Sequence, residues 1–144
     1  MLTPNRFVNV AGRCSTLWFS TRLEGTGLEP CDQPYIFFLC RHPRCTQDEL
    51  SRMLFVNKSS VTRRLARLER LGYVTRTQDP EDKRALLVEP TDKAIEVRQQ
   101  LHTLAKEWNA QLTAGFSEEE MNQFTALLER ALCNAKACTE ELAE

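Results

Sequence analysis

The sequence has no apolar stretch long enough to cross a lipid bilayer. Its longest uninterrupted apolar run, Tyr35 to Cys40, has six residues, whereas a membrane-spanning helix needs about 20. The first residues include Arg6 and Arg13 but not the apolar region of a secretory signal. We therefore expect a cytoplasmic protein without a membrane-spanning segment.

The sequence also has none of the usual signatures of an enzyme. It contains only two histidines, His42 and His102, which lie far apart in the chain. No nucleophile motif, phosphate-binding loop or metal-binding motif is present. Cys40, His42 and Cys45 have a metal-like spacing, but three such residues across a helix end are a weak zinc signal. We expect no catalytic residues, no bound metal and no cofactor.

Disulfide bonds are not expected either, although the cysteines are even in number. The chain is too long and too rich in helical patterns to need covalent cross-links. We expect reduced thiols, most of them small buried apolar residues. The six cysteines are Cys14, Cys31, Cys40, Cys45, Cys133 and Cys138.

The sequence does contain an uneven distribution of charge around a net charge of −1. Residues 57–84 hold eight basic and four acidic residues, a net charge of +4. Residues 117–144 hold seven acidic and two basic residues, a net charge of −5. A basic segment in a nearly neutral chain is typical of a local anion-binding surface, although a solvated helix surface would have the same composition.

Two short helices close together are predicted in the middle of the chain. Thr46 and Glu49 form a capping box before a helix that ends near Phe55. Asn57 is the N-cap of a second helix, whose apolar residues lie on one face and whose other face is basic. Gly72 fits the position just after this helix ends. Because the connection is short, the two helices must cross steeply, as in a helix-turn-helix.

A β-hairpin is predicted directly after these helices. Residues 73–77 and 85–89 are β-prone, and the polar loop between them, residues 78–84, contains an Asp-Pro pair and three acidic residues. This order predicts a mainly α (α+β) fold, a winged helix-turn-helix with a two-stranded wing. Further helical patterns lie on both sides of it, and the last one follows a capping box that starts at Ser117.

The start of the second helix carries side chains suited to DNA. An α-helix fits the major groove of B-DNA, and its N-terminal residues reach base edges. Arg63 is the candidate for reading a guanine, because a guanidinium can bind that base in a bidentate manner. Arg64 and Arg67 are expected to contact phosphates or only solvent. The other candidates on this helix are Asn57, Lys58, Ser59, Ser60 and Thr62.

Three segments, TQDELSRML, NKSSVTRRLARLERLGYV and DPEDKR, resemble the MarR family of bacterial transcriptional regulators. The resemblance is dense over residues 46–91 and looser over the rest of the chain. It implies that Arg84 in the wing reaches into the minor groove and that Asp82 helps to hold it. A narrow minor groove attracts arginine, whereas an exposed Asp82–Arg84 ion pair alone would contribute little. Arg76 and Lys83 complete the expected DNA-binding residues.

The resemblance also implies a homodimer. Helices within residues 1–27 and 92–137 would form a dimer platform next to the winged helix-turn-helix core of residues 31–90, all within a single domain. The long apolar stripes of these helices support this interpretation, although they could also pack within one chain. A two-fold dimer would place two recognition helices about 34 Å apart on a near-palindromic operator.

We therefore expect a sequence-specific DNA-binding transcriptional regulator, a homodimeric repressor released by a small-molecule or redox signal. The alternative is a winged-helix protein-interaction module without sequence-specific DNA binding. The outward basic side chains argue against it, because a protein-docking helix favours apolar or aromatic anchors. A small aromatic effector could lie among Cys14, Trp18, Tyr35 and Phe38, and Cys14 could be a redox sensor, although core packing is the stronger explanation for these residues.

Overall fold

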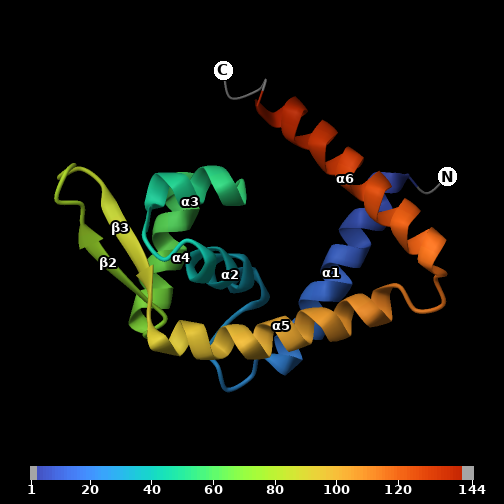
Figure 1. Ribbon diagram of the computed structural model, residues 1–144, viewed down its shortest axis with the longest axis horizontal. Coiled ribbons are helices and arrows are strands. Elements are labelled where there is room, and N and C mark those ends of the chain that lie inside the picture. The colour runs from blue at the N-terminus through green and yellow to red at the C-terminus, as the bar shows by residue number, and fades with distance from the viewer. Residues whose placement is uncertain (1–2, 141–144) are drawn as a thin grey trace. The chain divides into compact units, whose positions relative to one another are not determined.

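A computed structural model describes residues 3–140 (Figure 1). These fall into two compact units, residues 3–108 and residues 109–140. The division falls within a long helix, near the C-terminal end of that helix. The first unit contains both the first helix and the winged core. In chain order the elements are α1 (Pro4–Arg22), the 3-10 helix η1 (Pro30–Asp32), α2 (Gln33–Arg41), β1 (Cys45–Thr46), α3 (Gln47–Leu54), α4 (Lys58–Arg70), β2 (Val74–Gln78), β3 (Leu86–Pro90), α5 (Asp92–Leu112) and α6 (Glu118–Glu140).

Local sequence signals set the ends of the helix-turn-helix as predicted. The Thr46 hydroxyl accepts a hydrogen bond from the Glu49 backbone N–H at 3.2 Å, and the Glu49 carboxylate accepts one from the Thr46 N–H at 2.7 Å. The Asn57 side chain accepts from the Ser60 N–H at 2.8 Å and starts α4. Gly72, at φ +82°, ends α4, because a left-handed backbone costs glycine no steric strain.

The sheet has one more strand than the predicted two-stranded wing. β3 lies between β2 and β1, and both pairings are antiparallel. In β1, Cys45 pairs with Val88 and Thr46 with Leu87. Two residues carry no period-2 pattern, so this strand exists only because β3 provides an edge for it. It fixes the start of α3 against the wing.

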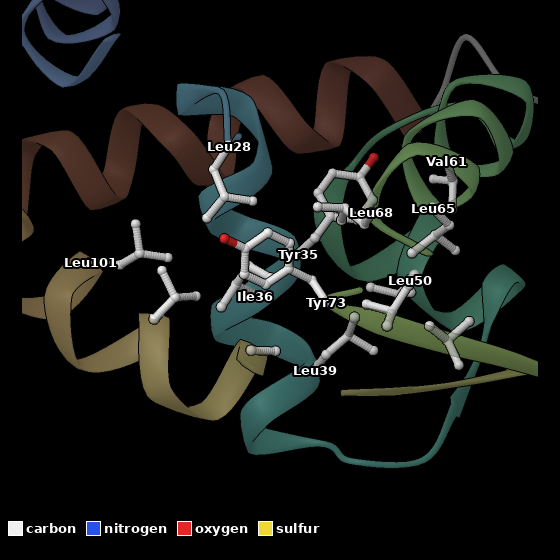
Figure 2. Packing of buried hydrophobic residues seen from close by; sticks show 14 of the residues in the cluster. Leu28, Tyr35, Ile36, Leu39, Leu50, Val61, Leu65, Leu68, Tyr73 and Leu101 are labelled. Carbon is white, nitrogen blue, oxygen red and sulfur yellow. The ribbon is translucent and has the colours of Figure 1, made fainter. Parts of the chain in front are cut away.

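The core of the first unit lies where α2, α3 and α4 meet (Figure 2). Ile36 and Leu39 of α2, Leu50 of α3, and Leu65 and Leu68 of α4 have no exposed surface. Their spacing places them on one face of each helix, and the opposite faces of α3 and α4 are polar, whereas α2 is apolar nearly all round. The buried side of α4 therefore determines which of its residues point outward.

The first unit also includes α1 and most of α5. Phe19 of α1 and Leu23, the residue that caps its C-terminal end, are buried, and so is Leu101 of α5. The rings of Trp18 and Trp108 lie 5.5 Å apart between centroids, so an aromatic contact joins the two helices. α1 is thus packed as part of the winged unit.

The second unit contains the end of α5 and all of α6. The Ser117 capping box begins α6 as predicted, with the Ser117 N–H bound to the Glu120 carboxylate at 2.8 Å. None of the described residues on the apolar stripe of α6 is buried in the single chain. Leu127, Leu128 and Leu132 are all exposed. The stripe shows amphipathic periodicity, but periodicity alone does not say what covers it.

Candidate nucleic-acid interface

The first two turns of α4 present a polar and basic face to solvent. Val61 and Leu65 lie on the buried side of this helix, whereas Lys58, Thr62 and Arg63 are exposed. The α-helical period places Arg63 on the side opposite Val61 and Leu65, whereas Lys58 is exposed as the first residue of the helix. Packing of the core therefore fixes the outward direction of the exposed residues. Cations and hydroxyls on the N-terminal half of one helix are the groups that contact phosphates and base edges in a major groove.

Some of the predicted DNA-binding residues also hold the helix start together. The Asn57 side-chain oxygen accepts hydrogen bonds from the Ser60 N–H and the Ser59 hydroxyl, both at 2.8 Å. The Thr62 hydroxyl donates to the Lys58 carbonyl at 3.0 Å. The amide nitrogen of Asn57 is the part of this side chain that can still donate outward.

The two cations at the start of the helix have only weak attachments. Lys58 forms an ion pair with Asp48 at 3.2 Å, but their side chains are 75% and 66% exposed, so this pair contributes little stability. The Arg63 guanidinium donates to the Ser60 hydroxyl at 3.3 Å. No carboxylate within residues 3–140 lies within ion-pair distance of Arg63. Both cations can therefore turn toward DNA at low cost.

Arg64 and Arg67 bind a carboxylate inside the protein, so the expectation that they contact only solvent is wrong, whereas a phosphate contact stays a prediction. Asp32 has no exposed surface, and its carboxylate accepts from Arg64 at 3.2 Å and from Arg67 at 2.6 Å. The same carboxylate accepts from the Glu29 N–H at 2.7 Å. Arg67 also donates to the Gly27 carbonyl. A buried carboxylate requires such partners. Here α4, more than 30 residues later in the chain, provides them.

This ion network connects the segment after α1 to the recognition helix. Glu29 also pairs with Arg64, and the hydrogen bond from Arg64 and the charge of Arg67 lower the pKa of the Glu29 carboxyl. Cys31 lies beside it, and partial desolvation of its sulfur raises the pKa of the thiol, although the residue as a whole is exposed. These groups line a surface pocket of about 460 Å³ together with Arg63 and other residues.

Arg76 at the base of the wing is also held from below. It pairs with Glu69 at 2.9 Å, and this hydrogen-bonded pair lowers the pKa of the Glu69 carboxyl. Its guanidinium also donates to the Gln47 side chain at 3.4 Å, and Gln47 donates to Thr62 at 3.3 Å. Gln47 thus links α3, α4 and β2, a role that no local motif in the sequence indicates.

The tip of the wing is ordered by its own aspartates. The Asp79 carboxylate accepts from the Glu81 N–H at 2.9 Å, and the Asp82 carboxylate accepts from the Arg84 N–H at 3.0 Å. Asp82 therefore holds the backbone of Arg84, and its contact is not the exposed side-chain ion pair considered above. The Lys83 and Arg84 side chains are exposed. The loop presents two cations beyond the end of the sheet.

Comparisons with known proteins agree with this geometry. Residues 32–85 match the family model described as MarR family. The HTH-type transcriptional regulator YwoH of Bacillus subtilis strain 168 is 30% identical over 120 residues, which cover 83% of this chain and 87% of that protein. The chain belongs to the MarR family. It is a DNA-binding transcriptional regulator with a winged helix-turn-helix fold.

Other members of the MarR family are similar over comparable lengths. The HTH-type transcriptional regulator BilQ of Clostridioides difficile strain CD3 is 28% identical over 107 residues, covering 74% of this chain and 72% of BilQ. The solved structure of a MarR protein from Peptoclostridium difficile DA00132 superimposes with a TM-score of 0.90 at 27% identity, covering 95% of this chain and 94% of that one. YwoH and BilQ are both named as HTH-type transcriptional regulators.

The four residues predicted to bind an effector do not share one site in this MarR-family chain. Cys14 is exposed on α1. The Trp18 ring packs against Phe19 and Trp108. Tyr35 is buried beside the pocket next to α4, whereas Phe38 lines a second pocket of about 370 Å³ near the end of α2. Tyr35 and Phe38 thus line different pockets.

The cysteines are free, but the prediction that most are buried is wrong. Cys45 is buried and Cys40 partly so, while Cys14, Cys31, Cys133 and Cys138 are exposed. Burial raises the pKa of the Cys45 thiol to about 11. Within residues 3–140, no three histidine, cysteine or acidic side chains gather where a metal ion would bind. No helix in the same residues is long and apolar enough to cross a membrane.

Proposed function

We propose that this regulator binds a near-palindromic DNA site as a homodimer, in the cytoplasm. The N-terminal half of α4 enters the major groove, where Arg63 reads a guanine and Lys58, Ser59 and Thr62 bind phosphates or base edges. Arg84 at the wing tip reaches the adjacent minor groove. Five further residues support or extend this contact: Asn57, Ser60, Arg76, Asp82 and Lys83.

The observation that carries the proposal is the two-sided character of α4. One side is buried in the core, and the other presents Lys58 and Arg63 without strong internal partners. A helix that docks on another protein would present apolar anchors at these positions. The inward binding of Arg64 and Arg67 reduces the number of arginines that face DNA and concentrates base reading on Arg63.

Exposed apolar side chains support the homodimer. Phe7, Val8 and Leu17 of α1 are exposed within the first unit, and Leu127 and Leu132 of α6 are exposed within the second. Apolar stripes on helices of a folded regulator are the kind of surface that a second copy covers. Two recognition helices related by a two-fold axis would contact half-sites one DNA turn apart.

We also propose that DNA binding represses transcription and ends when a small molecule or an oxidant acts on the protein. The exposed thiol of Cys14 and the pockets beside Tyr35 and Phe38 support this part of the proposal. Binding of either signal must favour a form of the dimer with lower DNA affinity, since a ligand with equal affinity for both forms shifts nothing.

A mobility-shift assay on duplexes selected from a random pool tests the DNA-binding part. Wild-type affinity should fall steeply with salt, and Arg63→Ala should weaken binding by about 10- to 100-fold and relax the sequence preference. Arg98→Ala, which removes an exposed arginine from α5, is the matched control and should bind as wild type does. If no duplex shifts at low salt, the protein-interaction module becomes the better description.

A further inference from the structure

Phe55, in the turn between α3 and α4, has a backbone conformation that disfavours its side chain. Its φ and ψ are 56° and 42°, in the left-handed region. Within residues 3–140, every other residue with positive φ is a glycine. A side chain with a Cβ atom is strained in this region, so a glycine would fit the turn with less strain.

Backbone and serine hydrogen bonds close the turn. The Phe55 and Val56 backbone N–H groups both donate to the Ser51 carbonyl. The Ser51 hydroxyl in turn donates to the Val56 carbonyl at 2.6 Å. These are backbone and serine contacts, and glycine at position 55 would retain them.

The ring is also not a core residue. Phe55 is 48% exposed, so about half of its surface remains open to an additional contact. A strained backbone that carries a large exposed aromatic ring is the kind of feature that persists for function more than for stability.

The position of Phe55 connects it to the proposed DNA interface. It lies two residues before Asn57, the N-cap of α4, and the exposed residues Lys58 and Ser59 follow directly. When the N-terminus of this helix enters the major groove, the turn before it lies at the edge of that groove. The ring is therefore continuous in the chain with the residues that are proposed to contact DNA.

We infer that Phe55 is a DNA-contacting residue that packs its exposed ring face against apolar nucleotide surface at the groove edge. This inference rests on the proposed function. Two apolar surfaces are available there, the deoxyribose and the 5-methyl group of thymine. A thymine contact would make Phe55 specificity-determining, whereas a deoxyribose contact would contribute affinity alone.

Phe55→Gly and Phe55→Ala separate the role of the ring from the strain of the backbone. Both variants should bind the duplex selected by the wild type about fivefold more weakly, since the contact buries about half of a phenyl ring. Phe55→Gly should melt roughly 4 °C above Phe55→Ala, because alanine keeps the left-handed strain and glycine does not. Phe55→Gly should thus bind DNA more weakly than wild type although its backbone is less strained. A merely structural role of the ring would not produce both results.

Two further measurements define the contact. The slope of log affinity against log salt should not change in either variant, because an apolar contact releases no counterions, whereas Lys58→Ala should reduce it by about 1. Replacing thymine by deoxyuridine at each position of the duplex shows whether the ring contacts a thymine methyl group or a deoxyribose. Loss of wild-type affinity at one position, absent in Phe55→Ala, identifies the thymine methyl; equal affinity throughout identifies the deoxyribose.

Met53→Ala is the matched control. Met53 is 62% exposed and lies two residues earlier on α3, where it lines the pocket that contains Phe38. Its truncation should leave DNA affinity within twofold of wild type. Phe55→Glu is the third variant, and it should weaken binding further than Phe55→Ala at low salt, since it places a carboxylate beside phosphates.

Two outcomes overturn the inference, and they are distinguishable. If wild type retains its duplex and all three Phe55 variants bind it equally well while folded, Phe55 does not contact DNA and the proposed function stands. If wild type retains no duplex from the pool, the proposed function fails, and the assignment of Phe55 fails with it.

Discussion

Replacement of Asp32 by asparagine should destabilise the protein far more than a surface charge would. Asp32 is the buried carboxylate that binds both Arg64 and Arg67, and it has no exposed surface, whereas Glu29, which also pairs with them, is about half exposed. Asparagine has nearly the same shape and retains an oxygen for the Glu29 N–H. It removes the negative charge and directs an amide N–H₂ toward one of the two guanidiniums.

The magnitude follows from the burial of the partners. Loss of one member of a buried ion pair costs about 3–5 kcal/mol, because the other charge remains without compensation. The Arg64 and Arg67 side chains retain 26% and 28% exposure, so water can solvate part of each guanidinium. We therefore expect Asp32→Asn to lower the free energy of unfolding by about 2–3 kcal/mol.

Urea denaturation followed by tryptophan fluorescence measures this difference. Protein concentration must be constant, because a dimer gains stability with concentration. Asp48→Asn is the control, since its pair with Lys58 is highly exposed and should cost less than about 1 kcal/mol. Equal losses in the two variants would refute the reasoning that the buried network holds α4.

Three other predictions concern separate parts of the fold. Tyr73→Phe should cost about 1 kcal/mol in urea unfolding, because it removes the 2.6 Å hydrogen bond from the phenol to the Thr26 carbonyl; no loss would mean that this bond adds nothing. Arg76 holds the pKa of the Glu69 carboxyl below its ordinary value of 4.5. The pair therefore stabilises the fold fully above about pH 4.5, and this stabilisation is lost as the pH falls through the lowered pKa. The urea midpoint of Glu69→Gln should therefore fall slightly less than that of wild type between about pH 5 and pH 2, and parallel curves would contradict this. Burial raises the pKa of Cys45 to about 11, so alkylation mapped by mass spectrometry should label Cys45 only after denaturation, unlike the exposed cysteines; early labelling would show that this part of the sheet opens.

The parts of the fold that local chemistry determines were predictable. The Thr46 capping box, the Asn57 cap and Gly72 define their helix ends through contacts within five residues, so the sequence contains all the information needed. The two predicted hairpin strands, residues 73–77 and 85–89, each begin and end one residue before the observed strands β2 and β3. The basic outer face of α4 followed from helical period alone.

The missing parts depend on residues distant in the sequence. Arg64 and Arg67 were expected to face outward because their partner Asp32 lies more than 30 residues earlier. The spacing of Glu29 and Asp32, a polar pair three residues apart around a proline, was the available signal for a structured turn there. β1 and Gln47 were missed for the same reason, since each acts through contacts with β2, β3 or α4.

Selection of bound duplexes by wild type and by Arg63→Ala tests the central claim most directly. Wild type should recover a near-palindromic sequence with half-sites centred about 10 base pairs apart, and the guanine preference at one symmetric position in each half-site should disappear with Arg63→Ala. Recovery of the same sequence with the same affinity by both proteins, or of no preferred sequence by wild type, would contradict the assignment of α4 as the helix that reads DNA.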